Sequence, residues 1–137
     1  VALALPPFDS RTPEVFRLWD ETLAVRGGTS EGRPRFTEGS AADPASGPSA
    51  ASVHNDLEEL IVSRHPQLAE YLEVLRRHGA RGAALSGSGP SVYGLFETRE
   101  EVSALLRAPE WRGVRVVSCG PVGRAEYRRR LGIPLSD

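Results

Sequence analysis

The sequence contains no methionine, no lysine and a single cysteine among its 137 residues. Cys119 has no partner for an internal disulfide, which is typical of a protein of the reducing cytoplasm. All 17 basic side chains are arginine, and the formal net charge of −1 argues against a domain-wide surface for nucleic acid. No apolar run approaches the roughly 20 residues that a membrane-spanning helix needs. We therefore expect a cytoplasmic protein that binds neither nucleic acid nor membrane.

Length and composition predict a single domain over residues 1–137, because 39% of the residues are hydrophobic and 26% are charged. The first residue is Val1, and the apolar start "VALALPPF" lacks the basic flank and cleavage site of a signal peptide. We expect from this that the chain is part of a longer protein. Residues 27–51 are rich in Gly, Ser, Pro and Ala, so we predict a flexible insert there.

Helix-start patterns occur three times. Pro13 suits the first position of a helix that Thr12 can cap, and an apolar stripe begins at Val15. Two further starts have the spacing of a capping box, in which a polar residue precedes Glu by three positions. These two pairs are Asn55 with Glu58 and Thr98 with Glu101.

The remaining elements follow from apolar periodicity and chain breakers. Pro66 ends one helix, and the next runs to a predicted C-terminal cap at Gly79. The helix after Thr98 has a stripe that includes Leu106, and the strand after it contains Cys119, which we expect to be buried. The arginine-rich tail after residue 123 is predicted to be peripheral.

The expected order is strand, helices, strand, strand, helix, strand. This order is typical of the ferredoxin-like split β-α-β arrangement, an α+β fold with a small antiparallel sheet and helices on one face.

A glycine-rich loop, Ser86-Gly87-Ser88-Gly89-Pro90, joins the two central predicted strands. Glycine tolerates positive φ, and successive N–H groups in such a loop can form a concave site for an anion such as phosphate. A loose, exposed turn is the alternative. The loop matches neither the dinucleotide fingerprint nor a P-loop.

The segment "GARGAALSGSGPSVYGLF" resembles the glycine-rich loop in the C-terminal domain of the GHMP kinases. The segments "TPEVF" and "NDLE" are similar to one branch of that family, whose substrate is a small cytidyl compound of isoprenoid biosynthesis. The resemblance covers residues 1–24 and 53–123. It implies a kinase that uses ATP and Mg²⁺, both bound mainly by an N-terminal domain that this chain lacks. Because the catalytic aspartate and lysine also belong to that domain, we expect this chain alone to be inactive and to bind no cofactor.

The resemblance also implies roles for individual residues. Phe16 would stack on the cytosine ring, with Thr12 and Pro13 lining the same pocket. The phosphate-proximal loop would comprise Ser86, Gly87, Ser88 and Gly89, with the Ser88 hydroxyl as a donor. It implies no catalytic residue in this chain, and the spacing of the three histidines and one cysteine predicts no metal site. Asn55 and Asp56 are expected to cap their helix.

Two other interpretations remain open. A GHMP kinase of the homoserine or mevalonate type would have a similar loop. A free-standing ferredoxin-like domain that binds a regulatory ligand would carry no kinase half at all.

Overall fold

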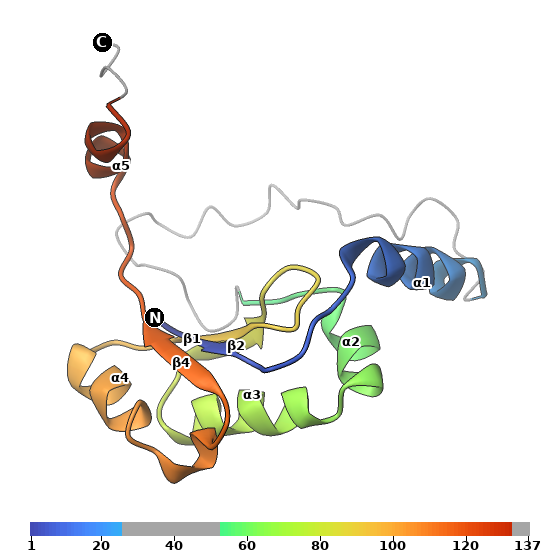
Figure 1. Cartoon of the computed structure of the whole chain (residues 1–137), viewed down its shortest axis with the longest axis horizontal. Coiled ribbons are helices and arrows are strands. Elements are labelled where there is room, and N and C mark those ends of the chain that lie inside the picture. The colour runs from blue at the N-terminus through green and yellow to red at the C-terminus, as the bar shows by residue number, and fades with distance from the viewer. Residues whose placement is uncertain (26–52, 133–137) are drawn as a thin grey trace.

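A computed structural model describes residues 1–25 and 53–132 of the chain (Figure 1). The insert predicted at 27–51 lies outside these residues. The strands are β1 (Ala2–Leu5), β2 (Gly82–Leu85), β3 (Val92–Leu95) and β4 (Arg115–Ser118).

Five α-helices accompany the strands in the described part of the chain. Their bounds are α1 (Thr12–Val25), α2 (Glu58–Arg64), α3 (Gln67–Arg77), α4 (Arg99–Leu105) and α5 (Arg124–Arg130).

The four strands form one sheet in the order β2-β3-β1-β4, with every neighbouring pair antiparallel. β1 therefore lies between β3 and β4, two strands that are distant from it in sequence. This is the strand order of the ferredoxin-like arrangement, and the predicted α+β class is confirmed.

One face of the sheet carries the hydrophobic core. The register aligns Leu85, Val92 and Ala4 across three strands, and all three are almost fully buried. Helices α3 and α4 lie on this face (Figure 1). At Gly94 a Cβ atom would come within 3.1 Å of Leu75 Cδ2 on α3, so glycine permits the close approach of this helix.

The opposite face of the sheet is also apolar. Leu3 pairs with Tyr93 on one side and Val117 on the other, and all three are half-buried. Alternate residues of a strand point to opposite faces, so Leu5 and Leu95 belong to this face as well. None of these five side chains belongs to the core cluster of the described residues. We call them the second sheet face.

Both predicted boundaries of α3 are confirmed, whereas the predicted end of α4 is an exception. Pro66 separates α2 from α3, and Gly79, at φ +94°, follows the end of α3. The N–H groups of Gly79 and Ala80 there donate back to the last turn of α3, in a Schellman motif. The exception is Leu106, predicted in the apolar stripe of α4. It follows the end of that helix and is 39% exposed.

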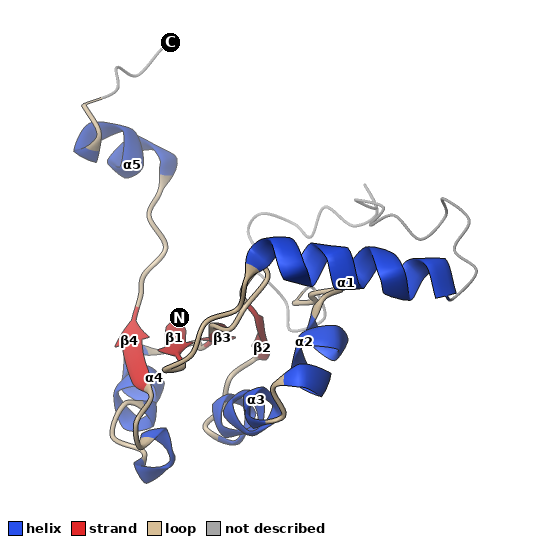
Figure 2. Cartoon of the chain, turned by 45° about the vertical axis from the view of Figure 1, so that its right-hand side comes forward, coloured by secondary structure: helices blue, strands red, loops and turns tan. Residues whose placement is uncertain are grey.

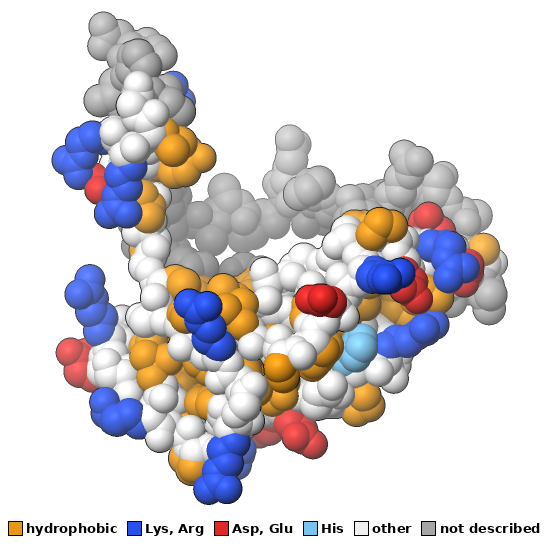
Figure 3. All heavy atoms as spheres, viewed as in Figure 1, with side chains coloured by type: hydrophobic (Ala, Val, Ile, Leu, Met, Phe, Trp, Pro, Cys, Tyr) orange, Lys and Arg blue, Asp and Glu red, His pale blue; other side chains and the backbone are white. Residues whose placement is uncertain are grey.

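Two helices lie away from the core face of the sheet. Figure 2 shows α1 running above α2, where Val15 is buried in the core cluster. Helix α5 buries none of its residues, which confirms that the tail is peripheral, and Figure 3 shows its arginine side chains around the projecting end of the molecule. The helices that pack on the sheet thus lie on one face, as expected, and α1 and α5 extend away from it (Figures 1 and 2).

The expectation that Cys119 is buried is also wrong. It follows the last residue of the edge strand β4 and is exposed. In the described part of the chain, no helix is both long and apolar enough to cross a membrane.

Candidate functional site

The glycine loop closes on itself through two backbone hydrogen bonds. Ser86 N donates to Ser91 O at 2.8 Å, and Gly89 N donates to Ser86 O at 3.0 Å. Gly87 and Gly89 have φ values of +59° and +74°, in the left-handed region that favours glycine. The loop is therefore a hydrogen-bonded turn. It is not the loose turn that was the alternative prediction from its composition.

Side chains from two distant segments hold the carbonyl groups of this loop. Asn55 Nδ2 donates to Leu85 O and to Gly87 O, each at 2.8 Å. Ser10 Oγ donates to Ser88 O, also at 2.8 Å.

Two amides of the loop stay available. Within residues 1–25 and 53–132, the N–H groups of Gly87 and Ser88 donate no hydrogen bond. A Cβ atom at Gly87 would meet nothing within 4 Å, so the loop is open on that side. The loop thus bares two amides, because those of Ser86 and Gly89 are used to build the turn.

The start of α1 contacts the same loop. Thr12 Oγ1 and Ser88 Oγ lie 2.8 Å apart, within hydrogen-bond distance. Because residues four apart share a side of a helix, Phe16 lies on the side of α1 that carries Thr12. Phe16 is 51% exposed and Pro13 is exposed as well. The structure therefore brings the two predicted sets of site residues together, and Phe16 is not a core residue.

Thr12 itself differs from the sequence prediction. It is the first residue of α1, and its hydroxyl bonds to Ser88.

The segment before α2 also departs from its predicted role. The capping box of Asn55 and Glu58 does not form, because α2 begins at Glu58 and has no side-chain cap. Asn55 Oδ1 accepts from Leu57 N at 2.9 Å, one turn too early to cap the helix. Glu58 Oε2 accepts from Leu85 N at 2.8 Å. Asp56, the other expected cap, pairs with His54 at 2.7 Å.

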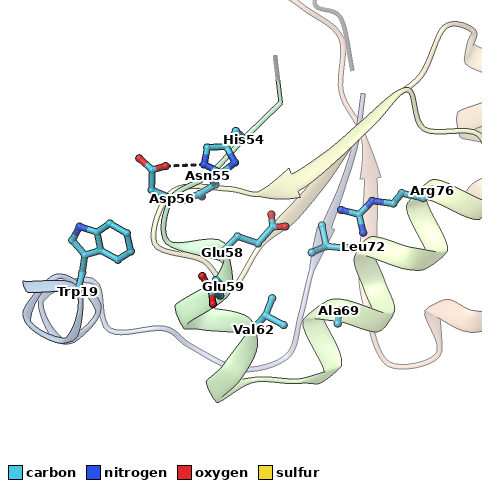
Figure 4. A pocket seen from close by; sticks show the side chains of 10 residues that line it. All are labelled: Trp19, His54, Asn55, Asp56, Glu58, Glu59, Val62, Ala69, Leu72 and Arg76. Carbon is cyan, nitrogen blue, oxygen red and sulfur yellow. Dashed lines mark hydrogen bonds and ion pairs between the residues drawn. The ribbon is translucent and has the colours of Figure 1, made fainter. Parts of the chain in front are cut away.

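A cavity of about 500 Å³ lies behind this segment (Figure 4). Its wall combines apolar groups with carboxylates, and Figure 4 shows Trp19 of α1 at one end and Arg76 of α3 at the other. Asn55 lines the cavity, but none of the predicted site residues does. No set of three or more His, Cys, Asp and Glu side chains that could hold a metal ion occurs among the described residues.

Sequence reasoning missed the residues that hold the loop. Asn55 and Glu58 carried a signal, the capping-box spacing, but that spacing points to a local role. Ser10 carried none, because a serine before a helix is common. The contacts that connect these residues to the loop span 27 to 78 positions of sequence.

Comparison with known proteins identifies the class. Residues 44–110 match the family model described as "GHMP kinases C terminal". Over these residues the chain is therefore similar to the C-terminal domain of the GHMP kinases, which agrees with the resemblance noted in its sequence.

Several similar curated proteins carry the name 4-diphosphocytidyl-2-C-methyl-D-erythritol kinase. The relative from Nitratidesulfovibrio vulgaris is 40% identical over 81 residues, which are 59% of this chain and 28% of that protein. The relative from Pelotomaculum thermopropionicum is 35% identical over 111 residues, 78% of this chain and 37% of its own length. A third, from Syntrophus aciditrophicus, is 48% identical over 52 residues, 38% of this chain and 19% of that protein. The chain thus matches between about a fifth and just over a third of the length of these relatives.

Proposed function

We propose that this chain is the C-terminal part of a kinase that transfers a phosphoryl group from ATP to the 2-hydroxyl of 4-diphosphocytidyl-2-C-methyl-D-erythritol. The observation that carries the proposal is the glycine loop inside the segment that matches the family, with amides at Gly87 and Ser88 that donate to no described residue. The names of the relatives supply the substrate.

The loop would act on phosphate oxygens. Enzymatic phosphoryl transfer depends mainly on positioning and on electrostatic stabilisation of the transferred group. The amides of Gly87 and Ser88 and the hydroxyl of Ser88 are the donors that we assign to this task. Ser86 and Gly89 would serve the same region by shaping the turn, since their own amides are used within it.

The start of α1 would hold the cytidyl end of the substrate. Phe16 offers an exposed aromatic face on the side of α1 that contacts the loop, and a nucleobase stacks well on such a face. Thr12 and Pro13 would line the same pocket, with Thr12 also fixing the position of Ser88.

The rest of the machinery would come from the remaining part of the protein. In this proposal an N-terminal domain binds ATP and Mg²⁺ and supplies the catalytic groups, so that this chain by itself is inactive. We infer that this domain covers the second sheet face, because five half-buried apolar side chains there lie outside the core cluster. The two relatives are long enough to contain such a domain, since more than 60% of each lies outside the segment that matches this chain.

A kinase assay on the complete gene product tests the proposal. We expect ATP-dependent phosphorylation of the cytidyl substrate by the complete protein and none by residues 1–137. Phe16→Ala should raise KM for that substrate about 5- to 150-fold, the equivalent of a lost stacking contact of about 1–3 kcal/mol. Its unfolding midpoint should stay close to that of the wild type, because Phe16 is half exposed.

Tyr127→Ala is the matched control, since this aromatic residue of α5 is exposed to a similar degree, 56%. It should leave KM unchanged. Turnover of homoserine or mevalonate in place of the cytidyl compound would reassign the substrate. A complete protein with no kinase activity, or no N-terminal domain in the gene, would leave the regulatory-domain interpretation.

A further inference from the structure

We propose that Asn55 is a positioning residue, whose side-chain amide fixes the direction in which the Ser88 N–H points. The catalytic part of this inference rests on the proposed function, whereas the structural part stands without it. Nothing in the comparisons or in the sequence patterns assigns this role to Asn55.

Both N–H groups and the oxygen of the Asn55 side-chain amide form hydrogen bonds. Both hydrogens of Nδ2 are used, on Leu85 O and Gly87 O, and Oδ1 accepts from Leu57 N. The opposite placement of the amide would put its NH₂ group against an N–H and its oxygen against two carbonyls. The surroundings therefore determine one orientation of this side chain.

This orientation dictates the direction of an amide on the other side of the loop. In a trans peptide the C=O and the following N–H point in opposite directions. The Gly87–Ser88 peptide is trans, and its carbonyl is held by Asn55. The Ser88 N–H consequently points away from Asn55, and it donates no hydrogen bond within the described residues.

The glycine at position 87 makes a restraint on the Gly87–Ser88 peptide necessary. A peptide that follows glycine can rotate at low cost, because an α-carbon without a Cβ atom restricts ψ as little as φ. Gly87 lies at φ +59° in open space, so no packing around its α-carbon restrains the plane. The hydrogen bond from Asn55 supplies that restraint, and the second bond, to Leu85 O, anchors the asparagine to the end of β2.

An exchange of the residues at positions 55 and 56 separates two roles of Asn55, namely its bonds to Leu85 O and Gly87 O and its local bond with Leu57 N. Aspartate at position 55 keeps an oxygen that accepts from Leu57 N but cannot donate to either carbonyl. The double variant Asn55→Asp/Asp56→Asn therefore conserves composition and net charge and removes the two donors, while it moves the carboxylate from position 56 to position 55. Asp56→Asn alone is the control, and Asn55→Ala removes the donors without placing a charge near the phosphate.

The first measurement uses the chain itself. NMR heteronuclear NOEs should show rigid Gly87 and Ser88 amides in the wild type and in Asp56→Asn. Both amides should become mobile in the double variant and in Asn55→Ala. Equal rigidity in all four proteins would overturn the inference, whatever the protein catalyses.

The second measurement uses the complete kinase. The double variant and Asn55→Ala should each lower kcat about 10- to 100-fold, the scale of a misplacement of roughly 1 Å, with KM for the cytidyl substrate within about threefold. A purely structural role would instead lower the unfolding midpoint and leave kcat of the folded enzyme unchanged, which would overturn the catalytic part. A wild-type protein without kinase activity would refute the proposed function alone, because the NMR result would still decide the structural part.

Discussion

Two segments of this protein begin a helix with the same sequence pattern and use it differently. At α4, Thr98 Oγ1 accepts from Glu101 N, and Glu101 Oε2 accepts from Thr98 N, so the capping box closes within four residues. At α2, Asn55 and Glu58 have the same spacing, but their side chains bond to β2 and to the glycine loop. A capping pattern in sequence therefore identifies side chains that seek backbone partners, and it does not say whose backbone they find.

The surroundings explain the difference. The start of α4 is at the surface, where both members of its pair are exposed or half-exposed and the backbone groups they bond to, those of Glu97, Thr98 and Glu101, are all local. The start of α2 lies against the end of β2, whose last residue, Leu85, presents an N–H and a C=O that need partners. A buried N–H without an acceptor costs about 1–3 kcal/mol, more than a capping bond contributes, so the long-range contact prevails.

The largest effect is expected at Glu58. Glu58→Ala should lower the free energy of unfolding by about 1–3 kcal/mol, because it leaves the Leu85 N–H without its acceptor. Urea unfolding measures this loss. Glu58→Gln keeps a carbonyl oxygen in place and should retain most of the stability.

The exposed Glu73 on α3 provides a further control for Glu58, since Glu73→Ala should change stability little. An effect of Glu58→Ala no larger than that of Glu73→Ala would remove the contrast between the two helix starts.

A smaller effect is expected at Thr98. Thr98→Ala should cost about 1 kcal/mol in urea unfolding, the usual value of a lost N-terminal cap. The loss should be local, so that hydrogen exchange accelerates at the Glu101 amide and not in the glycine loop. Ser103→Ala, at an exposed position on the same helix, should be nearly neutral. A spread of faster exchange to Leu85 would show that the two helix starts are coupled.

The smallest effect concerns pH at the same cap. The Thr98 N–H, followed by the Glu97 N–H, holds the pKa of Glu101 below its ordinary value of 4.5. Its stabilising contribution is therefore present above pH 4.5 and is lost as the pH falls through the lowered pKa of the folded protein. The stability difference between the wild type and Glu101→Gln should shrink between about pH 6 and pH 3. Urea midpoints across that range measure it, and a difference that grows with acidification would contradict the assignment.

The fold was largely predictable because its signals are local. Pro66 separates two helices since proline cannot continue the first, and Gly79 adopts the positive φ that ends α3. Leu106 and Cys119 were misjudged for the opposite reason. Both lie just beyond the end of an element with apolar periodicity, and the position of that end depends on the chain that follows.

The candidate site was predictable only in part. The composition of the loop from Ser86 to Pro90 pointed to backbone amides that face an anion, and the resemblance to the GHMP kinases added Thr12 and Phe16. Which amides stay free could not be read from composition, since that depends on which carbonyls and amides the turn itself consumes.

The sequence by itself determined the elements, their order, the glycine positions that allow the loop to turn, and the resemblance to the GHMP kinase family. These properties depend on residue type and on neighbours within a few positions. Only the tertiary structure decided that Ser10, Thr12 and Asn55 meet at one loop and that the amides of Gly87 and Ser88 have no partner among residues 1–25 and 53–132. The physical reason is that each hydrogen-bonding side chain has several possible backbone partners, and the packing of α1 and α2 beside β2 brings one of them within 3 Å.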